Sequence, residues 1–141
     1  MDILVERTIH AAPEEVARIM FDPANDTQWI SGARSVEKLT PGPTAVGTRV
    51  RHEGGFFGRK FSWVTEVTAL DPEARLDMNI VEGPIHGEVS FEVRPTAGGA
   101  IAAVHNRGSA GLPLPGMAWM VKRSVNEDLR RLAKLVAHQH V

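Results

Sequence analysis

His52 is the residue with the clearest capacity for chemistry in the 141-residue chain. Strand alternation places it on the same face as Val50, so an inward Val50 implies an inward His52. A neutral imidazole facing a cavity can donate or accept a ligand hydrogen bond, or transfer a proton. Glu82, which has inward parity on a later strand, is the carboxylate we would pair with it. The alternative is a partly exposed histidine beside a Gly54-Gly55 turn.

Other catalytic and metal-binding patterns are missing from the sequence. The chain has no cysteine, which excludes disulfides, thiolate ligands and cysteine nucleophiles. The serine of residues 107–111 (RGSAG) lacks the first glycine of a nucleophile elbow and precedes a proline loop, so Ser109 is not expected to be a nucleophile. The six histidines show no metal-ligand spacing, and we expect neither metal nor cofactor. Residues 54–58 (GGFFG) match no phosphate-binding loop and predict a hairpin tip, with Phe56 and Phe57 at a pocket entrance as the alternative.

A second group of residues can line an apolar pocket. Its members are Phe61, Trp63, Met78, Ile80 and Phe91 on predicted strands, and Met117, Met120 and Val121 on a predicted helix. Methionine adapts to irregular ligands, and a buried indole N–H prefers a partner. Ordinary core packing is the alternative explanation. Either His105 or Asn106 must point inward on the last strand, and the small residues that share the parity of Asn106 favour Asn106.

Short β-type runs separated by turn signals organise most of the chain. The pattern predicts strands at residues 2–10, 34–39, 46–53, 59–69, 74–82, 87–95 and 100–107. Short helices are predicted at about 13–21, where Pro13 fixes the first turn, and at about 24–30, which carries Trp29. Residues 117–137 place apolar side chains at i, i+3, i+4 spacing and predict one long helix.

This order of elements predicts an α+β fold, in which a seven-stranded antiparallel sheet wraps around a long C-terminal helix. The last helix is the one element long enough, at about 30 Å for its roughly 21 residues, to cover one face of the sheet. The two short helices lie between the first and second strands. No linker or repeat interrupts the chain, so we expect a single domain over residues 1–141.

The overall composition is that of a soluble globular protein. Hydrophobic residues make up 43% and charged residues 23% of the chain. Sixteen Lys and Arg oppose seventeen Asp and Glu, and this balance gives no reason to expect a nucleic-acid partner. No apolar run approaches the roughly 20 residues of a membrane span. The first seven residues reach charge too early for a signal peptide, so we expect a cytoplasmic protein.

Turn and packing signatures along the whole chain carry a family resemblance. They are Thr8-Ile9-His10-Ala11-Ala12-Pro13-Glu14-Glu15-Val16, the Asp22-Pro23…Trp29 segment, Val46-Gly47-Thr48-Arg49-Val50, Glu66-Val67-Thr68-Ala69-Leu70-Asp71-Pro72, Arg75-Leu76 and Gly98-Gly99. On these residues the chain resembles the helix-grip superfamily, which includes START-type domains, the pollen allergen Bet v 1 and bacterial polyketide cyclase/dehydrase-like SRPBCC proteins. The resemblance implies a cavity between sheet and long helix that binds sterols, lipids, polyketides or hormones.

The leading hypothesis is therefore binding of a small hydrophobic, lipid- or polyketide-like molecule. The expected ligand-binding residues are Phe61, Trp63, Met78, Ile80, Phe91 and Met120, with His52 and Asn106 as polar contacts and Trp29 packed at the cavity mouth. The second hypothesis is a polyketide cyclase/dehydrase-type enzyme in which His52, with Glu82 as a further candidate, moves a proton. The third is a protein-interaction module without a ligand. Each is compatible with a monomer or a homodimer.

Overall fold

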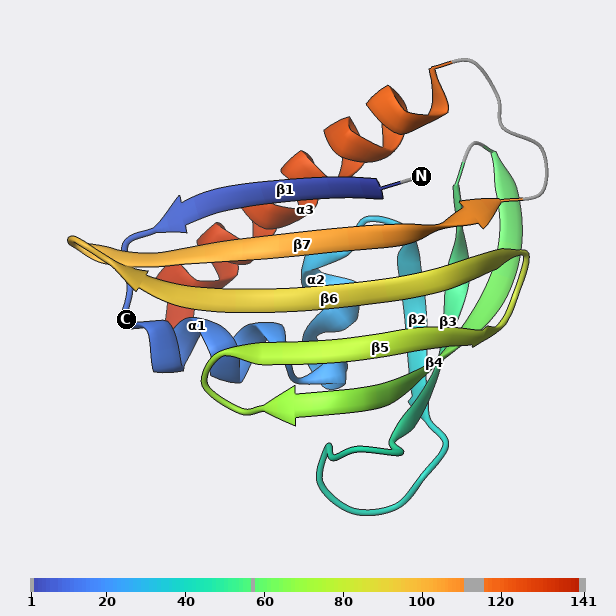
Figure 1. Cartoon of the computed structure of the whole chain (residues 1–141), viewed down its shortest axis with the longest axis horizontal. Helices are drawn as coiled ribbons and strands as arrows, with labels where there is room; N and C mark the ends of the chain where they lie inside the picture. Colours follow the sequence, from blue (N-terminus) through green and yellow to red (C-terminus); the bar gives the residue numbers. More distant parts are fainter. Residues whose placement is uncertain (1, 57, 111–115, 140–141) are drawn as a thin grey trace.

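The computed structural model describes residues 2–56, 58–110 and 116–139. Seven strands form one antiparallel sheet, and helices pack against one of its faces (Figure 1). The strands are β1 (Asp2–Ile9), β2 (Ala33–Lys38), β3 (Arg49–Phe56), β4 (Arg59–Asp71), β5 (Arg75–Glu82), β6 (Ile85–Thr96) and β7 (Gly99–Ala110). Their spatial order is β1-β7-β6-β5-β4-β3-β2, so each strand from β2 to β6 pairs with its successor and β1 pairs with β7.

The helices are α1 (Pro13–Met20), the 3₁₀ helix η1 (Pro23–Asn25), α2 (Asp26–Trp29) and α3 (Met117–Gln139). The predicted fold class is confirmed, including the short helices between the first two strands and the long C-terminal helix. The second short helix differs from its prediction because it is divided. Asp22 accepts a hydrogen bond from the Ala24 N–H at 3.0 Å and starts a 3₁₀ turn, which a single α-helical turn follows.

The course of β3 corrects one predicted turn. We expected a break at Gly54-Gly55, but β3 continues through both residues to Phe56. A Cβ at Gly54 would lie 1.7 Å from the carbonyl oxygen of Gly32, and Gly55 donates its N–H to the same oxygen at 3.1 Å. The two glycines therefore allow close approach of neighbouring backbone rather than a chain reversal. His52 consequently lies inside a strand.

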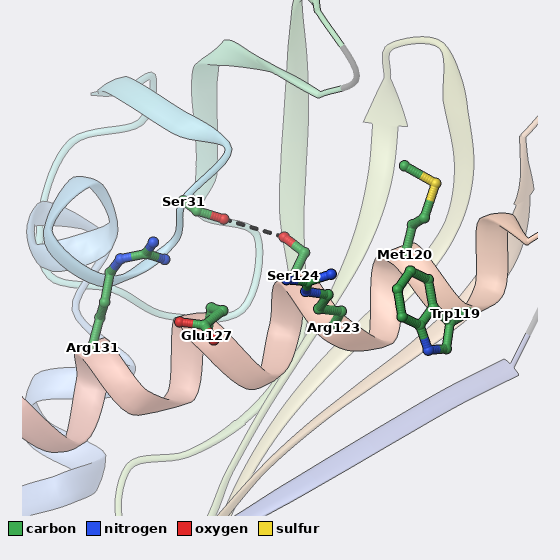
Figure 2. A pocket seen from close by; sticks show the side chains of 7 residues that line it. All are labelled: Ser31, Trp119, Met120, Arg123, Ser124, Glu127 and Arg131. Atoms are coloured by element: carbon green, nitrogen blue, oxygen red, sulfur yellow. Dashed lines mark hydrogen bonds between the residues drawn. The ribbon is translucent and has the colours of Figure 1, made fainter.

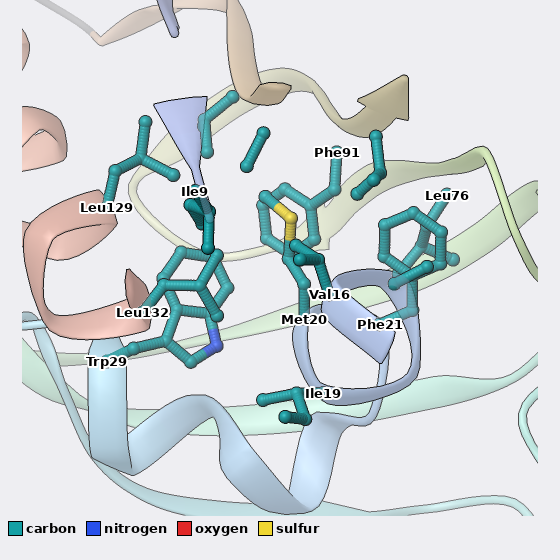
Figure 3. Close-up of a cluster of buried hydrophobic side chains, with 14 of the residues drawn as sticks. Ile9, Val16, Ile19, Met20, Phe21, Trp29, Leu76, Phe91, Leu129 and Leu132 are labelled. Atoms are coloured by element: carbon teal, nitrogen blue, oxygen red, sulfur yellow. The ribbon is translucent and has the colours of Figure 1, made fainter. Parts of the chain in front are cut away.

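Apolar side chains from the concave face of the sheet meet those of all three α-helices in one core (Figure 3). The largest hydrophobic side chains with essentially no exposure are Val16, Met20, Trp29, Leu129, Leu132 and Val136. Trp29 packs edge-on against Phe91, with ring centroids 5.2 Å apart. The expectation that Trp29 packs at a cavity mouth is therefore wrong, because its indole lies in the core.

Asp128 ties α3 to the segment that follows α2. This buried carboxylate accepts a hydrogen bond from the Ser31 N–H at 2.9 Å and one from Arg131 at 3.2 Å. Burial raises the pKa of Asp128, and the hydrogen bonds from Ser31 oppose that effect. Because α2 contacts both α3 and β2, it lies between the long helix and the edge of the sheet.

Truncation of Leu132 tests the position of α3 in the core. We expect Leu132→Ala to lower the free energy of unfolding by about 2–5 kcal/mol, because it removes buried methyl groups and leaves a cavity. Met120→Ala is the control, since Met120 is 43% exposed on the same helix and should change stability by less than about 0.5 kcal/mol. Urea unfolding measures both. Equal losses in the two variants would contradict this packing.

Candidate functional site

A buried histidine–carboxylate pair connects β3 to α2. His52 Nε2 lies 2.8 Å from Asp26 Oδ2, and the two residues are only 4% and 6% exposed. Asp26 is the first residue of α2, and His52 has the inward orientation that strand alternation predicts. A hydrogen bond at this distance between two groups withdrawn from water fixes the orientation of the imidazole ring.

Aromatic rings continue from this pair along the concave face of the sheet. His52 and Trp63 are opposite one another in the β3–β4 register, and their rings are stacked at a centroid distance of 5.1 Å with an interplanar angle of 7°. Phe61 follows, tilted against Trp63 at 5.6 Å. Phe61 and Trp63 are half-buried, whereas His52 is buried. The stack therefore leads from the buried pair to a more accessible part of the sheet.

The electrostatics of the pair are set by its removal from water. Burial raises the pKa of Asp26, while the hydrogen bond and charge of His52 act in the opposite direction and the nearby Asp22 charge adds to the rise. The other ring nitrogen of His52, Nδ1, is buried and has no hydrogen-bond partner among the described residues. Such an atom carries a desolvation cost until it meets a polar group.

A small cavity adjoins the pair. Its volume is about 20 Å³, enough for one water molecule or one group of that size. The lining residues are Met20, Phe21, Pro23, Asp26, Thr44, Thr48, Val50, His52, Thr65, Val67, Leu76, Met78 and Phe91. The described lining contains no lysine or arginine, and its ionisable side chains are those of Asp26 and His52.

The concave face of the sheet is covered unevenly along its strands. Side chains near one end, such as Leu76, Val93 and Ala102, are buried. Toward the other end the inward-facing side chains are half-buried across four neighbouring strands. We call these residues the half-covered patch: Phe61, Trp63, Ile80, Val89 and Asn106. Asn106 belongs to it because it pairs with Val89 and Ile3, whereas His105 is on the opposite face beside Asp2.

The apolar side chains along α3 change from buried to half-buried or exposed in the same direction. Val125, Leu129, Leu132 and Val136 are buried, but Val121 is half-buried, as is Met117, and Met120 is exposed. The first turns of the helix thus leave their apolar face incompletely covered. An apolar helix face of this kind normally packs against a partner surface.

An open groove of about 290 Å³ also runs along α3 (Figure 2). It is lined by Ser31, Trp119, Met120, Arg123, Ser124, Glu127 and Arg131. Ser31 and Ser124 approach across it with their hydroxyl oxygens 3.2 Å apart, and the Arg123 guanidinium lies 5.5 Å from the Trp119 ring centroid. Met120 is the predicted ligand contact in this groove, which is close to the smallest size usual for small-molecule sites.

The predicted site residues thus fall into three places. Phe61, Trp63, Ile80 and Asn106 belong to the half-covered patch, Met78 and Phe91 are buried in the core and border the small cavity, and Met120 lines the α3 groove. Glu82 is exposed at the end of β5, and the carboxylate in contact with His52 is Asp26. Phe57 lies outside the described residues, and so does the side chain of Phe56.

Asp26 is the functional candidate that the sequence analysis missed. It precedes the buried Trp29 by three residues, and residues three apart share a helix face. The signal available in the sequence was an acidic residue three positions before a tryptophan in a predicted helix. Within residues 2–56, 58–110 and 116–139, no group of three or more His, Cys, Asp or Glu side chains could hold a metal ion. None of the described helices has the length and apolar character needed to cross a membrane.

The family model described as "Polyketide cyclase / dehydrase and lipid transport" matches residues 2–137. A Thermus thermophilus protein of known structure is 21% identical, with a TM-score of 0.85 and 100% of both chains covered. The Zhui aromatase/cyclase from a Streptomyces species is 16% identical, with a TM-score of 0.79 over 100% of this chain and 96% of that one.

A START superfamily protein from Mycobacterium smegmatis is 20% identical, with a TM-score of 0.74 over 98% of this chain and 95% of that one. Similarity at these identities establishes the helix-grip fold of the chain and leaves its function to the site. A search of curated proteins gave no match.

Removal of the Asp26 carboxylate tests how much the buried pair contributes to the stability of the fold. We expect Asp26→Ala to lower the free energy of unfolding by about 1–3 kcal/mol, because it leaves a buried imidazole nitrogen unpaired. Asp77→Ala is the matched control: it breaks a surface ion pair with Arg75, whose nitrogen lies 2.8 Å from Asp77, and should cost less than about 1 kcal/mol. Urea unfolding at neutral pH measures both. Similar losses would mean that the pair contributes no more than a surface contact.

Proposed function

Because the chain belongs to the polyketide cyclase/dehydrase and lipid transport family, we propose that it binds a small, mainly hydrophobic molecule of lipid or polyketide type. The ligand lies on the half-covered patch, beneath the first turns of α3. The observation that carries the proposal is the gradient of exposure along the concave face, which leaves the inward-facing side chains of the patch half-buried on four neighbouring strands. An apolar ligand would remove that surface from water.

The composition of the patch fits a ligand that is apolar with few polar groups. Trp63 and Phe61 offer aromatic surface, and Ile80 and Val89 offer aliphatic surface on the next two strands. Asn106 contributes an amide that can donate or accept a hydrogen bond. Ligand sites are typically built this way, with a largely apolar lining and a small number of polar groups that fix orientation.

Occlusion of the patch by a larger side chain tests the proposal. In Val89→Trp the added indole would occupy the surface that the ligand needs, so affinity for the neutral fluorescent probe N-phenylnaphthylamine should fall about tenfold or more, which corresponds to about 1.4 kcal/mol. Glu88→Trp places the same side chain on the opposite face of β6, where Glu88 is exposed. Its affinity should stay within about twofold of the unmodified protein, because exposed ion pairs such as Glu88–Arg107 contribute little.

Fluorescence titration gives both affinities, and thermal unfolding checks that each variant is folded. Two results would contradict the proposal. One is the absence of saturable probe binding to the unmodified protein. The other is an equal effect of the two tryptophan substitutions, which would place the probe elsewhere on the molecule.

A second candidate function, acid–base catalysis on the bound molecule, is favoured by the Asp26–His52 pair. A histidine oriented by a carboxylate is a common proton-transfer arrangement. If the protein catalyses a dehydration, His52→Gln should retain the unreacted compound during purification. Organic extraction and mass spectrometry would then release from the variant a molecule heavier by one water than that from the unmodified protein. Release of the same molecule from both proteins would favour a binding function alone.

A further inference from the structure

The cavity beside the Asp26–His52 pair has the features of a built polar site. His52 and Asp26 are more than nine-tenths buried, and both line the cavity. Nδ1 of His52 lacks a partner among the described residues while Nε2 is held at 2.8 Å from Asp26. The hydroxyl-bearing side chains Thr48 and Thr65 line the same space. His52, whose Nδ1 is buried without a partner, lines this space of about 20 Å³. One polar group placed there would offset the desolvation cost of that nitrogen better than an apolar group.

The charge of the site selects against anions. Asp26 is a buried acid, and the described lining of the cavity holds no cation other than His52 when that ring is protonated. An anionic ligand group would meet the carboxylate in an environment that screens charge poorly. An uncharged group meets no such repulsion.

A hydroxyl group satisfies Nδ1 in either of its protonation states. With one proton shared between Nε2 and Asp26, Nδ1 accepts a hydrogen bond, and with an additional proton on the pair it donates one. A hydroxyl oxygen accepts and its hydrogen donates, so it can pair in both cases. The size of a hydroxyl group also matches the cavity, which holds one water-sized group.

We propose that the Asp26–His52 pair is a specificity site that binds one neutral hydroxyl group of the ligand at His52 Nδ1. The inference rests on the proposed function, since the rest of the ligand occupies the half-covered patch. Met78 connects the two places: it lines the cavity and pairs in register with Val89 of the patch. The thioether side chain of methionine is flexible enough to shift when a ligand enters. A water molecule is the other source of a hydroxyl group, and the test separates the two.

Three probes with one aromatic scaffold test the assignment. They are naphthol, methylnaphthalene, in which a methyl group replaces the hydroxyl, and the anion naphthoate. We expect naphthol to bind about tenfold or more tightly than methylnaphthalene, because a methyl group at Nδ1 would leave the nitrogen unpaired. Naphthoate should bind more weakly than naphthol, and Asp26→Asn should narrow that difference by removing the carboxylate charge. Isothermal titration at neutral pH measures each affinity.

The double variant Asp26→Leu/His52→Phe serves as the matched control. Replacement of both partners of a buried pair by apolar residues is usually tolerated by the fold, and thermal unfolding verifies it. We expect the preference to reverse, with methylnaphthalene binding more tightly than naphthol.

The outcomes separate the two proposals. Equal binding of naphthol and methylnaphthalene to the unmodified protein would overturn the hydroxyl assignment and leave water as the partner of Nδ1, while the ligand site would stand. Tighter binding of naphthoate than of naphthol would also overturn it. Failure of all three probes to bind would instead count against the proposed function.

Discussion

Two buried carboxylates hold α2, the shortest of the described α-helices, and the spacing of the layers depends on them. Asp26 begins α2 and contacts His52 on β3, while Asp128 on α3 accepts the N–H of Ser31, just beyond the end of α2. Each carboxylate has been desolvated, so each is stable only with its partner in place. The sheet, α2 and α3 are therefore connected through polar contacts that tolerate little displacement, with the Trp29 indole packed in the core between them.

The packing of α3 explains why the concave face is covered unevenly. The stripe of α3 from Val125 to Val136 is buried, whereas its first turns are not. The long helix crosses a sheet whose inner face changes from buried to half-buried in the same direction. The stacked rings of Trp63 and His52 connect the two regions. The candidate site thus consists of a polar anchor inside the core and an apolar surface outside it, joined by side chains of β3 and β4.

Strand alternation made much of this arrangement predictable. Period-two patterns depend on a single strand. They placed His52 on the face of Val50, and Trp63 on the face of Phe61, without any knowledge of the partner strands. Asn106 followed from the small residues of the same parity. Asp26 was missed because its partner is distant in sequence and its own helix is one turn long, too short for a periodic signal. The exposure of Glu82 and the burial of Trp29 likewise depend on tertiary packing, which local patterns do not contain.

The open sheet has one further consequence, which concerns its edges. The spatial order leaves β2 at the end of the sheet farthest from β1. A free edge can template the addition of a strand from another molecule, the first step of sheet-based aggregation. This edge is short and carries the exposed charged side chains of Arg34, Glu37 and Lys38. A second copy pairing there would have to strip water from those charges. The charged residues of β2 therefore disfavour the pairing of a second copy along this strand.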